Sequence, residues 1–226
     1  MSQTCPVYRE WEFIPDDLAG VDMLEFRLIY QGLLLGSGPG RQRSEHVQHI
    51  RRYLHRQLVN LWTAKHPLKG RIESYSAGGE IYRFGKDDLT NLYSLGNKRF
   101  LPVVSYRLEL ACSLDILLLR RDLGTILESG DLDNRIKTLI DALRIPRAGE
   151  IADGDEDPLY CLMEDDKLVT EIRVLADALL AEPEQIIENP KTNLAGEYTV
   201  SPNHVCAIIH CTVKTTRLML GNLDFA

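Results

Sequence analysis

The sequence predicts a single α+β domain in which a mixed β-sheet of about four or five strands packs against at least two helices. Alternating apolar and polar residues, the pattern of a strand with one face in the core, occur in four segments: 24–30, 106–118, 168–176 and 205–213. Apolar residues recur three or four positions apart in 44–62 and 136–143, as on the buried face of a helix. At 226 residues the chain is long enough for one core, and nothing in its length requires a second domain. We therefore treat 1–226 as one domain.

The N-terminal part of the chain is expected to contain one strand and one long helix. Residues 1–22 are polar and mixed, and they form an extension before the strand at 24–30. A glycine-rich stretch at 36–40 ends that strand, and Ser44 can cap the helix that follows. The buried stripe of this helix is expected to comprise Val47, Ile50, Leu54, Leu58, Leu61 and Trp62. The arginines of the helix mostly fall off that stripe, so we expect them to face solvent.

The remainder of the chain is expected to supply the rest of the sheet. Segment 65–98 is rich in glycine and polar residues, which predicts loops with a short strand near 80–84. The long strand at 106–118 comes before the second helix. An acidic insertion at 144–163 then separates that helix from the strand at 168–176.

Charge is distributed unevenly along the chain, whose formal net charge is −7. Eight of its 33 acidic residues lie in 150–166, which contains no lysine or arginine, so the rest of the chain is close to neutral. Segment 41–71 instead carries eight basic residues against Glu45 alone. This separation allows a basic tract that binds phosphates beside an acidic metal site. A solvated, basic helix face is the alternative interpretation.

The composition indicates a reduced, cytoplasmic protein with no membrane association. The five cysteines form no C-x-x-C pair, and Cys112 and Cys211 fall on the apolar phase of predicted strands, so we expect buried free thiols. No apolar run approaches the roughly 20 residues that span a bilayer. Residues 1–6 also lack the basic and apolar regions of a signal peptide.

The segment 130–137, with the sequence GDLDNRIK, carries the strongest functional pattern. If the chain is extended there, Asp131 and Asp133 point the same way and can converge on one cation. Asp133 or Asn134 can then cap the following helix, and Lys137 lies one turn beyond Asp133 on the same face. Carboxylate oxygens suit Mg²⁺ or Mn²⁺, and an adjacent ammonium suits a phosphate. The structural alternative is an aspartate cap with an i,i+4 salt bridge.

A second carboxylate pair, Asp165 and Asp166, opens the predicted strand at 168–176. A D-x-D-N-x-x-K helix start followed by a D-D pair resembles the RusA-type Holliday-junction resolvases. The resemblance implies that Asp131, Asp133 and Asp166 bind Mg²⁺ and that Lys137 faces the scissile phosphate. It is close over about forty residues, and a compatible order of elements extends over more of the chain.

The resemblance further implies a Mg²⁺-dependent (or Mn²⁺-dependent) endonuclease that acts as a homodimer on branched DNA. Hydrolysis would leave a 5′-phosphate and a 3′-hydroxyl. Asp165 and Asn134 would serve as supporting or alternate ligands. The basic tract would hold the DNA backbone through five arginines: Arg41, Arg43, Arg51, Arg52 and Arg56.

Two other functions stay open at this point. The net negative charge and the acidic insertion also suit a catalytically weak or inactive RusA-like scaffold that binds protein or nucleic acid. A nuclease with another substrate, such as RNA, is the third reading, because the insertion can reshape the groove beside the metal.

Three further motifs are incomplete. The glycines of 36–40 lack the G-K-S/T ending of a phosphate loop. His46, His49 and His55 share a helix without the partners of a zinc site, so we expect them on its polar face. Segment 153–164 matches the acidic positions of an EF-hand loop but has proline where that loop needs glycine, which leaves a calcium-binding module as the weakest alternative.

Overall fold

The computed structural model describes residues 23–36, 40–69, 93–120, 131–151, 155–180 and 203–225. Among these residues the structure contains helix α1 (Gly40–Ala64) and helix α3 (Asp131–Leu143). Its strands are β1 (Glu25–Leu33), β2 (Ser94–Leu95), β3 (Lys98–Val104), β4 (Leu110–Arg120), β5 (Leu159–Met163), β6 (Val169–Ala178) and β7 (His204–Thr215). The same residues also form short 3₁₀ helices: η2 (Ala148–Glu150), η3 (Asp166–Leu168) and η4 (Leu220–Phe225).

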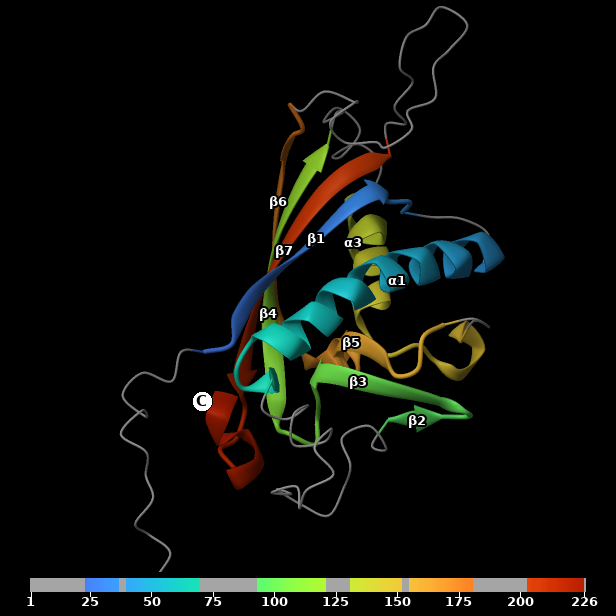
Figure 1. The fold of residues 1–226 in the computed structure, drawn as a ribbon. Coiled ribbons are helices and arrows are strands. Elements are labelled where there is room, and N and C mark those ends of the chain that lie inside the picture. The colour runs from blue at the N-terminus through green and yellow to red at the C-terminus, as the bar shows by residue number, and fades with distance from the viewer. Residues whose placement is uncertain are drawn as a thin grey trace, which may run out of the picture.

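A four-stranded mixed sheet forms the centre of the fold, with the strand order β1-β7-β4-β6. Strand β7 is antiparallel to both β1 and β4, whereas β4 and β6 run parallel. Helices α1 and α3 lie on one side of this sheet (Figure 1). The predicted α+β class, the mixed sheet and its packing against two helices are therefore confirmed.

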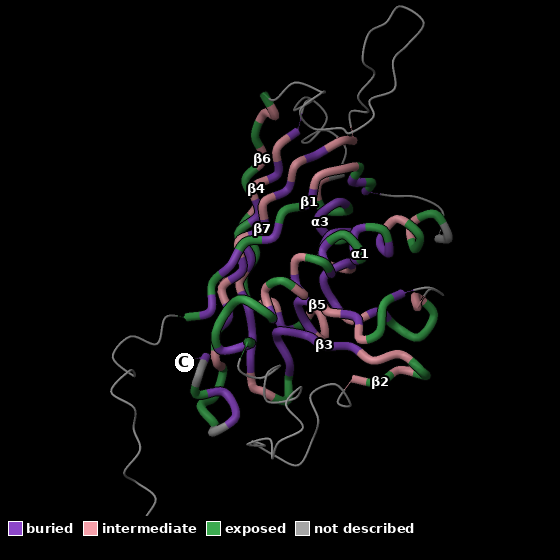
Figure 2. Tube along the Cα trace, in the orientation of Figure 1, coloured by how far each residue is buried: buried purple, intermediate pink, exposed green. Residues whose placement is uncertain are grey.

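The core lies between the sheet and the two helices. Over most of β1, β4 and β7 every second residue is buried, and Leu28, Leu114 and Ile209 are examples. Leu54 of α1 and Leu139 of α3 belong to the same buried cluster. Strand β6 differs, because most of its residues are exposed or half-buried (Figure 2).

A second sheet, with the order β2-β3-β5, was not predicted. Its two longer strands, β3 and β5, are parallel, and β5 lies within the segment 144–163 that we expected to be an acidic loop. These strands are almost continuously buried, so they lack the alternation that marks a half-exposed strand.

Several element boundaries differ from the predictions. Helix α1 begins at Gly40, so Ser44 lies inside it and does not cap it. The predicted strand at 106–118 begins only at Leu110, because residues 106–109 form a turn that Leu110 closes by donating its N–H to the carbonyl of Ser105. Glu109 has a φ of 49° in this turn. The predicted strand at 80–84 and the extension at 1–22 lie outside the described residues.

Four cysteines in the described part are free thiols, and the predicted burial of Cys112 and Cys211 is confirmed. Burial raises the pKa of Cys112 to about 12. Neither α1 nor α3, the helices of the described residues, combines the length and the apolar character that crossing a membrane requires.

Candidate functional site

The start of α3 places the two aspartates of the D-x-D-N motif differently from the prediction. The helix already begins at Asp131, so Asp131 and Asp133 both belong to its first turn. Helical residues two apart point about 200° away from each other. The prediction that the two converge from an extended segment, and that Asp133 or Asn134 caps the helix, is therefore wrong. Their position is still electrostatically favourable, because carboxylates in the first turn interact with the helix dipole.

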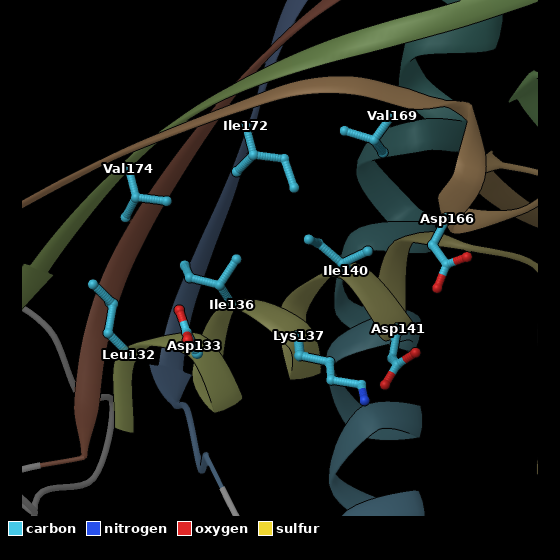
Figure 3. A pocket seen from close by; sticks show the side chains of 10 residues that line it. All are labelled: Leu132, Asp133, Ile136, Lys137, Ile140, Asp141, Asp166, Val169, Ile172 and Val174. Atoms are coloured by element: carbon cyan, nitrogen blue, oxygen red, sulfur yellow. The ribbon is translucent and has the colours of Figure 1, made fainter. Parts of the chain in front are cut away.

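The same helix brings three charged side chains onto one face. Asp133, Lys137 and Asp141 follow one another at intervals of four residues, and all three line a pocket of about 660 Å³. Asp166 of η3 lines the same pocket (Figure 3). Three of the four residues that the resemblance assigns to catalysis thus share one pocket. The side chain of the fourth, Asp131, lies outside the described part of the chain.

Apolar side chains form the rest of the pocket wall. Helix α3 contributes Leu132, Ile136 and Ile140, and β6 contributes Val169, Ile172 and Val174 (Figure 3). The charged groups therefore lie beside a low-dielectric surface, where electrostatic interactions are stronger than in open water.

The two members of the D-D pair have different roles. The Asp165 carboxylate caps η3 by accepting the N–H of Lys167 at 3.0 Å, and this hydrogen bond holds the pKa of Asp165 below its ordinary value. Asp166 is the member that lines the pocket. We had expected the pair to open the strand directly. Instead, the turn of η3 separates the pair from the start of β6.

The carboxylates of the pocket suit Mg²⁺ in chemistry, since this ion commonly binds through one or two carboxylates and keeps several waters. Asp133 is exposed and Asp166 is half-exposed, so both are accessible to a hydrated ion. Among the side chains that the structure describes, no three His, Cys, Asp or Glu residues are grouped closely enough to hold a metal. The ligand set of Asp131, Asp133 and Asp166 thus stays a prediction, as does the supporting role of Asn134, which is exposed on α3.

The arginines expected to hold DNA are largely engaged inside the protein. Arg51 was predicted to face solvent, but its side chain is only 1% exposed. It donates to Gln48 Oε1 at 2.5 Å and to the carbonyl oxygen of Asp141 at 2.7 Å, so it ties α1 to α3. Arg43 binds the Asp141 carboxylate at 2.7 Å. The burial of Arg51 therefore contradicts the prediction that its guanidinium binds DNA.

Arg52 and Arg56 remain closer to the expectation. Half of the Arg52 side chain is exposed, although its Nε donates to Asp155 Oδ1 at 2.7 Å. Arg56 is exposed on α1. The side chain of Arg41 lies outside the described part of the chain.

The acidic insertion packs against α1 and β3. Asp155 is buried and accepts hydrogen bonds from Arg52 and Gln48, while its carbonyl oxygen accepts one from Lys98 at 2.6 Å. Asp157 accepts the backbone N–H of Arg99 at 2.8 Å. Residues 155–157 thus fasten the loop before β5 to its neighbours, and none of them lines the pocket at α3, where we had expected the insertion to lie.

His55 also differs from the prediction, because it is buried. Its Nδ1 accepts the N–H of Tyr160 at 3.0 Å, and its Nε2 lies 2.8 Å from Glu156 Oε2. Since Nδ1 is occupied as an acceptor, Nε2 carries the proton and donates it to the carboxylate. The ring therefore bridges the insertion and β5.

Asp141 is the pocket residue that the sequence reasoning missed. Its position, one turn beyond Lys137, was a signal that could have identified it. Comparisons with models of protein families, with curated proteins and with solved structures gave no match to this chain.

Proposed function

We propose that this protein is a Mg²⁺-dependent endonuclease of the RusA type, which hydrolyses phosphodiesters in branched DNA. The observation that supports the proposal is the common pocket of Asp133, Lys137 and Asp166, residues that two separate motifs contribute from α3 and η3. A pair of carboxylates and one ammonium on a shared wall are the groups that metal-assisted hydrolysis of a phosphodiester needs.

Asp133 and Asp166, which line the pocket from α3 and η3, would hold the cation. The bound ion would withdraw negative charge from the phosphate and lower the pKa of a water. The Asp165 carboxylate already accepts the backbone N–H of Lys167 as the cap of η3. Its contribution would therefore be to position Asp166.

Lys137 would stabilise the charge that develops on the phosphate oxygens in the transition state. Its acidic neighbours along α3 are Asp133 and Asp141, one turn away on either side, and both carboxylate oxygens of Asp141 are already engaged. Oδ2 accepts from Arg43 at 2.7 Å, and Oδ1 accepts from Arg144 at 3.1 Å. The Asp141 charge is thereby largely compensated, which leaves the charge of Lys137 available to a phosphate.

The proposed enzyme would act as a homodimer, and the exposed strand β6 supports this. Among the described strands it lies at the edge of the main sheet, and Ile172 and Leu175 are 45% and 63% exposed. Unprotected edge strands readily pair with a second chain. An antiparallel pairing of two copies centred on Ile172 would place Glu171 of each copy opposite Arg173 of the other, which is a self-complementary arrangement.

Other registers of the same pairing are less favourable. Centring it on Arg173 would oppose two arginines, and centring it on Val174 would oppose Glu171 and Asp177. Like charges directly opposite each other are destabilising. Pairing about Ile172 would leave both pockets on the same side of a continuous sheet, where two strands of one junction could reach them.

A binding module is the second candidate function, and the apolar wall of the pocket favours it. Six of the ten residues lining the pocket are apolar, and β6 beside them is an edge strand of the main sheet as far as the described residues show. An extended peptide could add to such an edge and insert alternate side chains into the pocket. This candidate requires no catalysis.

Cleavage assays distinguish the two candidates. Labelled four-way junction, flap, duplex and single-stranded DNA, and the corresponding RNAs, would be incubated with Mg²⁺ or Mn²⁺. Asp133→Asn is expected to abolish cleavage while DNA binding persists, and Lys137→Ala is expected to slow cleavage without unfolding the protein, because Lys137 is exposed. Asp177→Asn on β6 serves as the matched control. Cleavage that survives in Asp133→Asn would contradict the proposed site, and cleavage of no substrate would favour the binding module.

A further inference from the structure

The loops at the Asp166 end of the pocket carry exposed side chains that the proposed mechanism does not use. The turn between β3 and β4 contributes Tyr106, the segment after α3 contributes Arg147, and η3 contributes Lys167. All three side chains are exposed, in contrast to Arg51 of α1, whose side chain is only 1% exposed. A nucleic acid can therefore reach these three groups, which come from three different segments of the chain.

Hydrogen bonds of the backbone fix Tyr106 beside the D-D pair. Its N–H donates to Glu164 Oε2 at 3.0 Å, and the N–H of Glu164 donates to the carbonyl oxygen of Val104 at 2.9 Å. Asp166 follows Glu164 by two residues, a span of at most about 7 Å along the chain. The pKa of Tyr106 lies above its ordinary value because of partial burial and because of the negative charge of three carboxylates, those of Asp165, Glu164 and Asp166. The phenol is therefore near the residue proposed to bind the cation.

The turn that carries Tyr106 is held in place while the ring stays accessible. Glu109 donates its N–H to the carbonyl oxygen of Tyr106 at 3.0 Å. The amide of Asn222, which is buried, donates to the carbonyl oxygen of Leu108 at 2.7 Å. The backbone of the turn is thereby fixed, and the Tyr106 residue is 48% exposed. A fixed, exposed ring loses little conformational entropy when a flat ligand stacks on it.

Arg147 and Lys167 flank the same pair of aspartates. The N–H of Ile145 donates to the carbonyl oxygen of Met163 at 3.0 Å, which brings the segment leading to Arg147 alongside the end of β5. The pKa of Asp165 is lowered first by its hydrogen bond from the Lys167 N–H and further by the charges of Lys167 and Arg147. The two cations therefore lie within electrostatic range of the D-D pair, and their exposure makes them accessible to phosphates.

An exposed tyrosine ring beside two exposed cations suits an unpaired nucleotide. Proteins that bind single strands combine basic groups that contact the backbone with aromatic side chains on which bases stack. A base inside a continuous duplex is stacked on both faces by its neighbours, so it has no face to offer a protein ring. An unpaired base has such a face and can leave the stack at little cost.

We propose that the surface formed by Tyr106, Arg147 and Lys167 binds an unpaired nucleotide next to the phosphodiester that is cut. Its base stacks on the Tyr106 ring, and the phosphates on that side of the cut contact Arg147 and Lys167. The span of at most about 7 Å from Glu164 to Asp166 corresponds to about two nucleotides that rise 3.4 Å each. The stacked base therefore lies within about two nucleotides of the cation site.

This inference rests on the proposed nuclease function and names its substrate class. A flap, or a junction between a duplex and a single strand, supplies an unpaired nucleotide beside a paired one. A fully paired duplex or four-way junction does not, so both should bind this surface more weakly.

Binding without cleavage tests the stacking contact. The affinity for a labelled flap DNA would be measured in EDTA for wild type, Tyr106→Ala and Tyr106→Phe. Tyr106→Ala should weaken binding by about 5-fold to 150-fold, the range expected for the loss of one stack between a base and an aromatic ring. Tyr106→Phe keeps the ring and should bind like wild type. Both variants should fold, because the hydrogen bond to Glu164 comes from the backbone.

Tyr53→Ala is the matched control, since it removes a 38% exposed tyrosine from α1 that does not line the candidate pocket. Urea unfolding of Tyr106→Ala and Tyr53→Ala checks that each subunit is intact. Equal affinity of Tyr106→Ala, Tyr53→Ala and wild type for the flap would overturn the inference.

The salt dependence of binding tests the two cations. Arg147→Met and Lys167→Met should each reduce the slope of log K against log salt by about 0.7 to 0.9, as the loss of one phosphate contact does. Tyr106→Ala should leave the slope unchanged, because it removes no charge. Lys214→Met is the matched control, since Lys214 is exposed and its neighbour Val213 faces the core, which places Lys214 on the sheet face opposite the helices. Slopes of Arg147→Met and Lys167→Met that equal the slope of Lys214→Met would overturn the phosphate contacts.

Chemical substitution of the DNA locates the stacked base. An abasic nucleotide placed one or two positions from the cut should weaken binding to wild type but have no further effect on Tyr106→Ala. Wild type and Tyr106→Ala should bind a fully paired duplex equally. An equal loss of affinity for flap and duplex in Tyr106→Ala would overturn the unpaired base as the ligand.

The same variants separate this inference from the proposed nuclease. If Asp133→Asn loses cleavage while Tyr106→Ala binds the flap like wild type, the nuclease stands and the stacking contact is wrong. If Tyr106→Ala loses affinity for the flap while Asp133→Asn still cleaves, the stacking contact stands and the proposed metal site is wrong. If wild type binds no nucleic acid with or without Mg²⁺, both proposals fail.

Discussion

Charge reversal on β6 tests the proposed homodimer with few confounding effects. Within one chain Arg173 contacts Asp115 at 3.3 Å and Glu171 at 3.2 Å, and all three side chains are about half exposed or more. Glu171→Arg and Arg173→Glu each replace two opposite-charge pairs across the twofold axis by two like-charge pairs. The double variant restores opposite charges with the signs exchanged, so it should dimerise again.

The size of the effect follows from the strength of exposed ion pairs. One such pair contributes about 0.5 kcal/mol, and a like-charge pair costs a similar amount. Exchanging two attractive pairs for two repulsive ones therefore changes the dimerisation free energy by about 2 kcal/mol, which is about 30-fold in Kd. The double variant should recover most of that difference.

Sedimentation equilibrium at several protein concentrations measures these Kd values, and urea unfolding of each variant checks that the subunit itself is intact. High salt should reduce the difference between the single variants and wild type, because exposed charges are screened. Single variants that dimerise as tightly as wild type would refute the β6 pairing. Double and single variants that are weakened equally would refute the register centred on Ile172.

Three further predictions concern the stability of the subunit. Asp155→Ala should reduce the free energy of unfolding by about 2–3 kcal/mol, because two side chains of α1 donate hydrogen bonds to this buried carboxylate. Asp157→Ala should reduce it by less than about 1 kcal/mol, because its ion pair is exposed. Urea unfolding of both variants compares the two effects. Leu139→Ala should cost about 2–5 kcal/mol, since Leu139 is fully buried in the core, and loss of less than about 1 kcal/mol in urea would contradict that packing. The pKa of Glu150 lies below its ordinary value of 4.5, so its carboxylate stabilises the fold above that pH and loses this effect as the pH falls through the folded-state pKa. The difference in unfolding free energy between wild type and Glu150→Gln should therefore be full near neutral pH and shrink in acid, and a difference that is constant down to about pH 2 would contradict the role of Arg144 as its partner.

The main sheet could be predicted because its strands alternate. The predicted strands at 24–30, 168–176 and 205–213 each fall on an observed strand of similar length. The alternation at 106–118 predicted a strand that starts four residues too early. Leu108 follows the apolar phase because it packs against the core, but it lies in a turn. Strands β3 and β5 could not be found in this way, because burial of nearly every residue removes the period of two.

The candidate site was only partly predictable. The spacing of four residues placed Asp133 and Lys137 on one helix face correctly, because that relation holds wherever the helix begins. The geometry of Asp131 relative to Asp133 depended on the helix boundary, which local sequence defines poorly. The burial of Arg51 and Asp155 arises from contacts between segments about a hundred residues apart, as in the hydrogen bonds from Gln48 and Arg52 to Asp155. No local pattern in the sequence reports such contacts.

The position of β7 has a consequence for how this protein is made. The last strand of the described residues lies in the middle of the main sheet, between β1 and β4. Until the ribosome has released residues 204–215, β1 and β4 cannot pair with it, and both expose an open edge with its backbone N–H and C=O groups. Because the N-terminal segments emerge first, the nascent chain passes through a long stage in which the sheet cannot close. Chaperone binding to those open edges would therefore influence the yield of folded protein.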